Sequence, residues 1–154
     1  MRLAIGSDEA GFDLKELLKA ELAAGGHEVE DYGTAAGESA LYPDVAFAVA
    51  EGVAAGRHER AVLVCGTGIG MCISANKVKG VRAAQAHDTY SAERAQKSND
   101  AQVLCLGARV VGPELARSIL AAFMASRFEA GRSADKVRRI QAFEDQALEE
   151  RAAG

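Results

Sequence analysis

Residues 61–70 read AVLVCGTGIG, and this segment indicates the class of fold. Its first half is a continuous apolar run, which is typical of a strand buried on both faces. Its second half is a loop with glycine at every second position, and a helix is predicted to follow from about Ile69 to Lys77. A buried strand that leads through a short loop into a helix is a building unit of parallel sheets. We therefore expect an α/β fold.

The same alternation of short apolar runs and longer periodic segments continues on both sides of this stretch. Strands are predicted at residues 3–7, 27–32, 61–65, 81–86 and 102–106. Helices are predicted through the leucines at 14–22, ending at Gly25-Gly26, and over 44–55, 69–77, 89–97, 113–128 and 133–154. Together they indicate a single α/β domain over residues 1–154. It would be a Rossmann-like three-layer sandwich, with a five-stranded parallel sheet flanked by helices and right-handed crossovers.

The last predicted helix, residues 133–154, differs from the others in its pattern. It carries charge on most faces and has a thin apolar stripe formed by Val137, Ile140, Phe143 and Leu148. A stripe this narrow is better suited to docking on a neighbour than to building a core. We therefore expect this C-terminal helix to pack on a partner subunit.

Length, charge and cysteine content limit the class of protein. A chain of 154 residues, of which 49% are hydrophobic, can bury one core of its own. The net charge of −4 and the pI near 5.4 argue against nucleic acid or an anionic membrane as a partner. The chain start lacks a signal-peptide pattern, no run is long enough to span a bilayer, and the three cysteines have no paired spacing. These features predict a cytoplasmic protein with reduced thiols.

The candidate functional residues are predicted to lie along one rim of the sheet, at the carboxyl ends of its strands. Parallel sheets bind ligands beyond the carboxyl ends of their strands. That rule places four segments together: Ser7-Asp8, the loop 65–70, His87-Asp88 and residues 107–109.

The glycine loop at this rim is predicted to bind an anion. Gly66, Gly68 and Gly70 allow a tight turn that points backbone N–H groups inward, next to the start of a helix. The spacing differs from the dinucleotide fingerprint, because no glycine trio follows the first strand. It also differs from a nucleotide P-loop, because no Gly-Lys-Ser/Thr ending is present. The alternative is a tight turn with a purely structural role.

Cys65 stands between the buried strand and this loop. A nearby helix start and nearby cations favour the thiolate form of a cysteine, so Cys65 is a candidate base. The alternative is an inert small hydrophobic residue. Cys72 and Cys105 fall within the helix and strand patterns and are expected to be buried bystanders.

Basic residues and histidines supply the other candidates. Arg132 and Lys136 are four residues apart on a predicted helix, and with Arg109 they could hold a phosphate. Arg138-Arg139 are better explained as a solvated face. His87 lies at the rim, either as a structural residue or as part of the site, whereas His27 and His58 have surface-like contexts. No metal is expected, since no group of histidines, cysteines and acids has ligand spacing.

Several stretches resemble the ribose-5-phosphate isomerase B family, which also includes galactose-6-phosphate isomerase subunits and tetrulose-phosphate isomerases. They are GSDEAGF at 6–12, YPD at 42–44, CGTGIGMCISANK at 65–77, VRA at 81–83, SND at 98–100, GARVVG at 107–112 and GR at 131–132. The match covers nearly the whole chain. Its most specific part is the cysteine–glycine loop followed by ANK.

The resemblance implies a metal-free, cofactor-free aldose–ketose isomerase that works through a cis-enediolate. By position, Cys65 would move a proton between C1 and C2, and Thr67 with the loop amides would stabilise the enediolate oxygens. Some family members lack this cysteine and use a glutamate six residues later, where this chain has Met71. The phosphate would be held by Arg109, Arg132 and Lys136, the last in place of a more usual arginine. The sugar would be bound by Asp8, Glu9, Gly66, Gly68, Ile69, Gly70, His87, Ser98 and Asn99.

The sequence departs from the family at two positions. Typical ribose-5-phosphate members have histidines, associated with opening the sugar ring, where this chain has Glu9 and Ser98. A tetrose 4-phosphate cannot close a furanose ring, because its O4 is esterified, and it therefore needs no ring-opening group. These departures indicate a four-carbon substrate. The stretch AHDTYSAERA at 86–95 also resembles the D-erythrulose-4-phosphate isomerase branch, which serves erythritol-type catabolism.

The substrate interpretation is therefore D-erythrulose 4-phosphate ⇌ D-erythrose 4-phosphate, and other interpretations stay open. Ribose 5-phosphate is the alternative substrate, with Glu9 or His87 in place of the missing groups. A non-catalytic module that binds a sugar phosphate or a nucleotide could use the same fold. Thiol redox regulation through Cys65 is disfavoured, since no C-x-x-C spacing is present. The resemblance also implies a homodimer or a dimer of dimers, with active sites shared between subunits.

Overall fold

The centre of the molecule is one parallel sheet of five strands. The structure, a computed structural model, describes residues 1–153 and leaves out the side chain of Arg151. The strands run in the spatial order β2-β1-β3-β5-β4, and each pair of neighbours is parallel. Their bounds are β1 (Arg2–Ser7), β2 (Glu28–Asp31), β3 (Arg60–Cys65), β4 (Ala83–Gln85) and β5 (Val103–Gly107).

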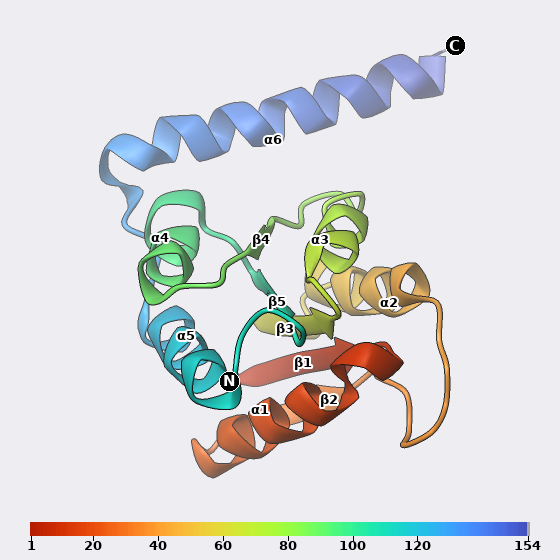
Figure 1. Cartoon of the computed structure of the whole chain (residues 1–154). Coiled ribbons are helices and arrows are strands. Elements are labelled where there is room, and N and C mark those ends of the chain that lie inside the picture. The colour runs from red at the N-terminus through yellow and green to blue at the C-terminus, as the bar shows by residue number, and fades with distance from the viewer. Residues whose placement is uncertain (154) are drawn as a thin grey trace.

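Helices cover both faces of this sheet and make it the middle of three layers (Figure 1). On one face, apolar residues of α1 (Phe12–Ala24), α4 (Thr89–Asn99) and α5 (Pro113–Ala125) form a core with the strands. On the other face, α2 (Tyr42–Ala54) and α3 (Ile69–Ala75) form a second core. A short 3-10 turn, η1 (Glu9–Gly11), links β1 to α1. The predicted Rossmann-like sandwich is confirmed.

The central strand β3 sets the position of the glycine loop. All six of its residues are buried, and their side chains alternate between the two cores. Cys65 pairs with Gly107 of β5, while Val64 pairs with Ser7 of β1. The carboxyl ends of β1, β3 and β5 therefore lie side by side, as the sequence predicts.

Several predicted element ends differ from the structure, and side-chain hydrogen bonds explain two of them. Helix α5 ends at Ala125 rather than at residue 128, because the buried Arg60 guanidinium donates hydrogen bonds to carbonyl oxygens at the end of the helix. These are the oxygens of Phe123, Met124 and Ser126, at 2.8, 3.2 and 2.6 Å. Strand β4 starts at Ala83 rather than at residue 81, because the N–H of Arg82 donates to the side chain of Gln102 at 2.8 Å.

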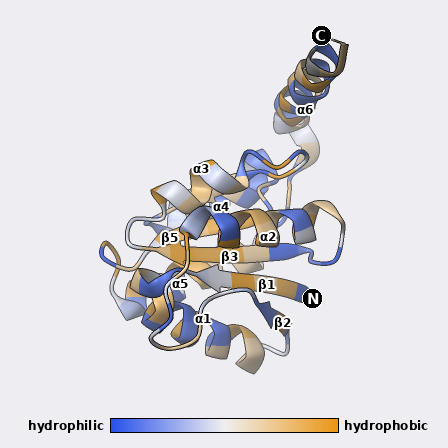
Figure 2. Ribbon diagram, turned by 90° about the vertical axis from the view of Figure 1, so that its right-hand side faces the viewer, coloured by the Kyte–Doolittle hydropathy of each residue, from blue (hydrophilic) through white to orange (hydrophobic). Residues whose placement is uncertain are grey.

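Helix α6 (Ala130–Ala153) projects from the three layers and carries both polar and apolar residues along its length (Figure 2). It begins three residues before the predicted Ser133, with a non-helical backbone at Gly131. Gly154, where the predicted helix and domain end, lies outside the described residues. The later part of the helix contacts the connection between α3 and β4, where Asp145 forms a salt bridge with Lys79 at 2.9 Å and Glu144 accepts from the N–H of Gly80. None of the helices within residues 1–153 combines the length and hydrophobicity needed to cross a membrane.

Candidate active site

A pocket of about 550 Å³ opens at the carboxyl ends of β1, β3 and β5. This volume lies within the range of small-molecule sites. Its lining comes from η1 and the residue before it, the end of β3, the glycine loop, α3, the start of α2 and the turn after β5. The residues are Asp8, Glu9, Ala10, Tyr42, Cys65, Gly66, Thr67, Ile69, Gly70, Ile73 and Arg109.

Cys65 lies at the floor of this pocket. Its side chain belongs to the core between the sheet and α2 and α3, and the residue is only 5% exposed. The N–H of Gly68 donates to the Cys65 Sγ at 3.1 Å. A sulfur that accepts from an amide and borders a pocket has a partner that stabilises a negative charge on it.

Close backbone packing against β5 holds the glycine loop in this shape. Gly68 has φ +77°, and a Cβ there would lie 2.9 Å from the backbone of Leu106. A Cβ at Gly107 would likewise lie 2.8 Å from the backbone of Thr67. The N–H of Ile69 donates to the Thr67 hydroxyl at 3.3 Å. The loop therefore packs closely against the end of β5.

Arg109 brings positive charge to the same pocket. The turn that carries it is bonded to the loop, since the N–H of Ala108 donates to the Cys65 carbonyl at 2.8 Å. The N–H of Arg109 itself donates to the Gly66 carbonyl at 3.0 Å. The guanidinium lies over Gly66, where a Cβ would be 3.4 Å from its Nη1. A cation and a thiol therefore share one cavity.

The acidic residues after β1 form the opposite wall. The Asp8 side chain accepts from the N–H of Gly11 at 3.1 Å and so caps the 3-10 turn. The Glu9 side chain accepts from the N–H of Ala40 at 3.5 Å, which ties this wall to the connection between β2 and α2. Both residues line the pocket, as predicted.

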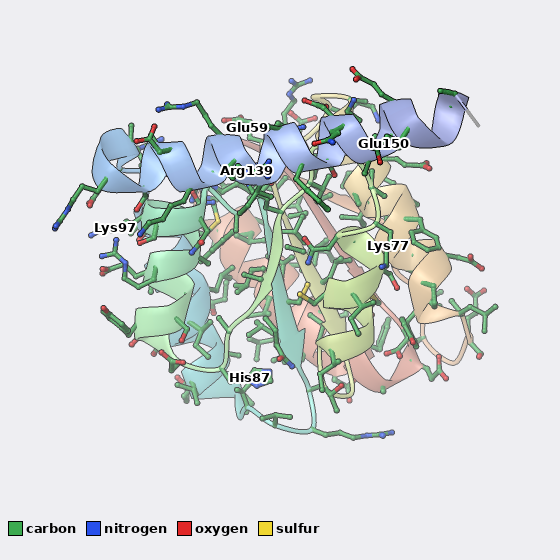
Figure 3. The ribbon with its side chains drawn as sticks, turned by 90° about the horizontal axis from the view of Figure 1, so that it is seen from above. Glu59, Lys77, His87, Lys97, Arg139 and Glu150 are labelled. Carbon is green, nitrogen blue, oxygen red and sulfur yellow. The ribbon has the colours of Figure 1, made fainter. Side chains whose placement is uncertain are left out.

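His87 lies at this end of the molecule but outside the pocket lining (Figure 3). Its Nε2 accepts from the N–H of Gly107 at 3.0 Å, so this nitrogen carries no proton in that bond. The contact supports Gly107, which packs on Thr67. Within one chain, the structural interpretation of His87 is therefore favoured over direct contact with a ligand.

Four further predicted site residues are not brought to the pocket within one chain. Asn99 ends α4, and the Ser98 hydroxyl accepts from the Arg94 side chain at 3.0 Å. Arg132 and Lys136 lie in α6, which crosses the molecule at the end away from His87 (Figure 3). The two groups adjoin each other, because the N–H of Glu129 donates to the Lys97 carbonyl. All four residues therefore lie on α4 and α6, two helices that contact each other.

Several features of the structure were missed or mispredicted. Tyr42 lines the pocket with its ring against Gly70; the quoted YPD motif contained it, but its role was not predicted. His58 is buried rather than at the surface, with its Nε2 2.8 Å from the Tyr32 hydroxyl. Cys72 is half-buried rather than buried, whereas Cys105 is buried as expected. Within residues 1–153, no cluster of three or more His, Cys, Asp or Glu side chains could hold a metal ion.

Comparison with known proteins identifies a family for this arrangement. The model of the ribose/galactose isomerase family matches residues 3–140. A D-erythrulose-4-phosphate isomerase from Pectobacterium atrosepticum is 54% identical over 147 residues, which cover 95% of this chain and 97% of that protein. A ribose-5-P isomerase B from Listeria innocua is 50% identical over 137 residues, 89% of this chain and 93% of that protein.

A solved structure agrees with these sequence matches. The ribose-5-phosphate isomerase B of Clostridium thermocellum superposes with a TM-score of 0.93 at 42% identity. The superposition covers 96% of this chain and 99% of that one. The chain therefore belongs to the ribose/galactose isomerase family and is a sugar-phosphate isomerase.

Proposed function

We propose that the enzyme interconverts D-erythrulose 4-phosphate and D-erythrose 4-phosphate, with Cys65 as the base. The observation that carries this proposal is the pocket itself. It joins a thiol, amide donors and the Arg109 guanidinium around one cavity of small-molecule size. Such a set can remove a proton from carbon and stabilise the negative charge that then forms on oxygen.

The proposed reaction moves one proton between neighbouring carbons. In the ketose-to-aldose direction, the Cys65 thiolate removes a proton from C1. The released electron pair forms the C1=C2 double bond, and the former C2 carbonyl becomes an enediolate oxygen. The proton then passes from the sulfur to C2, while the O1 hydroxyl loses its proton, O2 gains one, and C1 becomes the aldehyde. Thr67 and the loop amides would bind the two oxygens, and Arg109 would bind the phosphate.

Glu9 and Ser98, which replace the ring-opening histidines of typical ribose-5-phosphate members, support a four-carbon substrate. Glu9 lines the pocket, but it accepts a hydrogen bond from Ala40. The Ser98 hydroxyl is engaged with Arg94. A tetrulose 4-phosphate arrives as an open chain and requires neither group. The similarity to the D-erythrulose-4-phosphate isomerase of Pectobacterium atrosepticum also supports a four-carbon substrate.

A comparison of substrates tests this proposal. Purified enzyme is assayed with D-erythrulose 4-phosphate, ribose 5-phosphate and a hexose 6-phosphate, with the enzyme concentration and pH held constant. We expect kcat/KM to be at least about tenfold higher on the tetrulose phosphate, the scale on which one carbon changes recognition in a pocket. A higher kcat/KM on ribose 5-phosphate would establish the alternative substrate. Binding of the sugar phosphates without turnover would indicate a non-catalytic module.

Ribose 5-phosphate is the second candidate substrate. The Listeria innocua relative is a ribose-5-P isomerase B at 50% identity, only slightly below the identity to the tetrulose-phosphate isomerase. The Glu9 carboxylate in the pocket is a group that could exchange protons with a sugar ring.

We further propose that two copies of the chain share each active site. Among the described residues that line the pocket, Arg109 is the sole cation. Arg132 and Lys136 are directed elsewhere in their own chain, on a helix that exposes apolar residues, including Phe143 at 64%. In a symmetric dimer, that helix could bring Arg132 and Lys136 to the pocket of the second copy, and the end of α4 could bring Asn99.

Hybrid dimers test the sharing of sites. Cys65→Ala and Arg132→Ala chains are each expected to be nearly inactive. Co-expression should restore about a quarter of wild-type activity, because half of the random dimers are hybrids with one intact site each. The matched control pairs Cys65→Ala with Arg109→Ala, which would affect the same chain's pocket and should give no recovery. Absence of recovery in the first pair would contradict a shared site.

A further inference from the structure

Gln85 stands outside the pocket lining, yet it contacts the loop that carries the thiol. It is the last residue of β4, and its side chain is exposed. Its Nε2–H donates to the carbonyl oxygen of Thr67 at 2.6 Å. That carbonyl belongs to the peptide between Thr67 and Gly68, whose N–H donates to the Sγ of Cys65 at 3.1 Å. One peptide therefore joins Gln85 to Cys65.

The geometry of a peptide makes this connection specific. A trans peptide is planar, and its C=O and N–H point in opposite directions. Holding the carbonyl of Thr67 therefore also aims the N–H of Gly68 at the sulfur. A donor on the carbonyl further polarises the N–H, since hydrogen bonds in a chain strengthen one another. Without that donor, the glycine at position 68 leaves this peptide easier to rotate.

We propose that Gln85 is a positioning residue for Cys65. It holds and polarises the peptide whose N–H stabilises the Cys65 thiolate. The catalytic consequence rests on the proposed function, in which this thiolate is the base. The effect on the sulfur itself is independent of that function.

The charged and titratable groups around the sulfur come from other elements. Asp8 and Glu9 line the pocket from the β1 side, Tyr42 from α2 and Arg109 from the turn after β5. Cys105 of β5 lies in the same core as Cys65. The Gln85 side chain is uncharged, so replacing it by another uncharged residue leaves this set unaltered.

Thiol reactivity tests the proposal without reference to catalysis. The rate of Cys65 alkylation by iodoacetamide is measured at pH 7, with the modified residue identified by mass spectrometry. Gln85→Met keeps the length of the side chain but removes the donor, and it should slow alkylation about fivefold, the scale of one neutral hydrogen bond. Gln85→Glu, whose carboxylate repels the Thr67 carbonyl, should slow it further. Gln146→Met, on α6, is the matched control and should react like the wild type.

The outcomes separate this inference from the proposed function. Slower alkylation together with a parallel fall in kcat, at unchanged KM and unchanged thermal unfolding, supports both. Slower alkylation with full turnover supports the role of Gln85 and contradicts Cys65 as the base. Wild-type alkylation rates in both Gln85→Met and Gln85→Glu would overturn the role of Gln85.

Discussion

Replacing Cys65 by alanine is expected to lower kcat by about three orders of magnitude, the usual contribution of a positioned acid–base group. KM should change little, because in the proposed mechanism the thiol acts on a carbon-bound hydrogen, whereas Arg109 binds the phosphate. The loop that holds Cys65 is fixed by backbone packing at Gly68 and Gly107, so the variant should keep the fold. Steady-state kinetics with a thermal unfolding measurement would check this result.

Cys72 provides the matched control for this experiment. The pKa of the Cys72 thiol is lowered to about 7, mainly by a hydrogen bond with Cys105. Partial burial raises this pKa, whereas the Gln85 N–H and the Asn76 side chain lower it further. Cys72 is therefore the alternative candidate for a reactive thiol in this chain. It lies outside the pocket lining, and its Sγ donates to the Ala83 carbonyl at 3.4 Å. Cys72→Ala should retain wild-type kcat. A loss of activity in Cys72→Ala, with Cys65→Ala active, would contradict the assignment.

Replacing Arg109 by alanine is expected to lower kcat/KM about a hundredfold, the scale of two hydrogen bonds to a charged group. The loss should appear only with phosphorylated substrates. With unphosphorylated D-erythrulose, the slow residual rate should be the same in wild type and variant. The ratio of kcat/KM for the two substrates therefore isolates the phosphate contact.

Arg109→Lys is the control for charge. It keeps one positive charge but loses the planar fork that matches a phosphate, so an intermediate kcat/KM is expected. An equal loss on phosphorylated and unphosphorylated substrates would mean that Arg109 does not act on the phosphate. In that case its contact with Gly66 would point to a role in shaping the loop.

The parts of the molecule that could be predicted are those determined by local sequence. The apolar run before GTGIG predicts a buried strand and a turn into a helix, and the structure has β3 and α3 at these positions. The rule for parallel sheets then places Asp8, Cys65 and Arg109 at one rim, and all three line the pocket. These predictions succeed because periodicity and strand direction suffice to make them.

The parts that could not be predicted depend on contacts between distant segments. Arg60 ends α5 through carbonyls more than sixty positions away, which no helical pattern reveals. His58 follows a polar stretch, yet it is buried against Tyr32, and burial is the main cause that lowers its pKa. Gly52 leaves room for it, since a Cβ there would lie 2.8 Å from the ring. Gln85 likewise reaches Thr67 only through the fold.

In the proposed mechanism, the Cys65 sulfur carries a proton between two carbons of the substrate. NMR in D₂O follows this transfer as exchange of the substrate C–H with solvent. Wild-type enzyme is expected to place deuterium on the carbon next to the carbonyl, whereas Cys65→Ala should place none over many wild-type turnover times. Exchange at the wild-type rate in Cys65→Ala would contradict this role of Cys65.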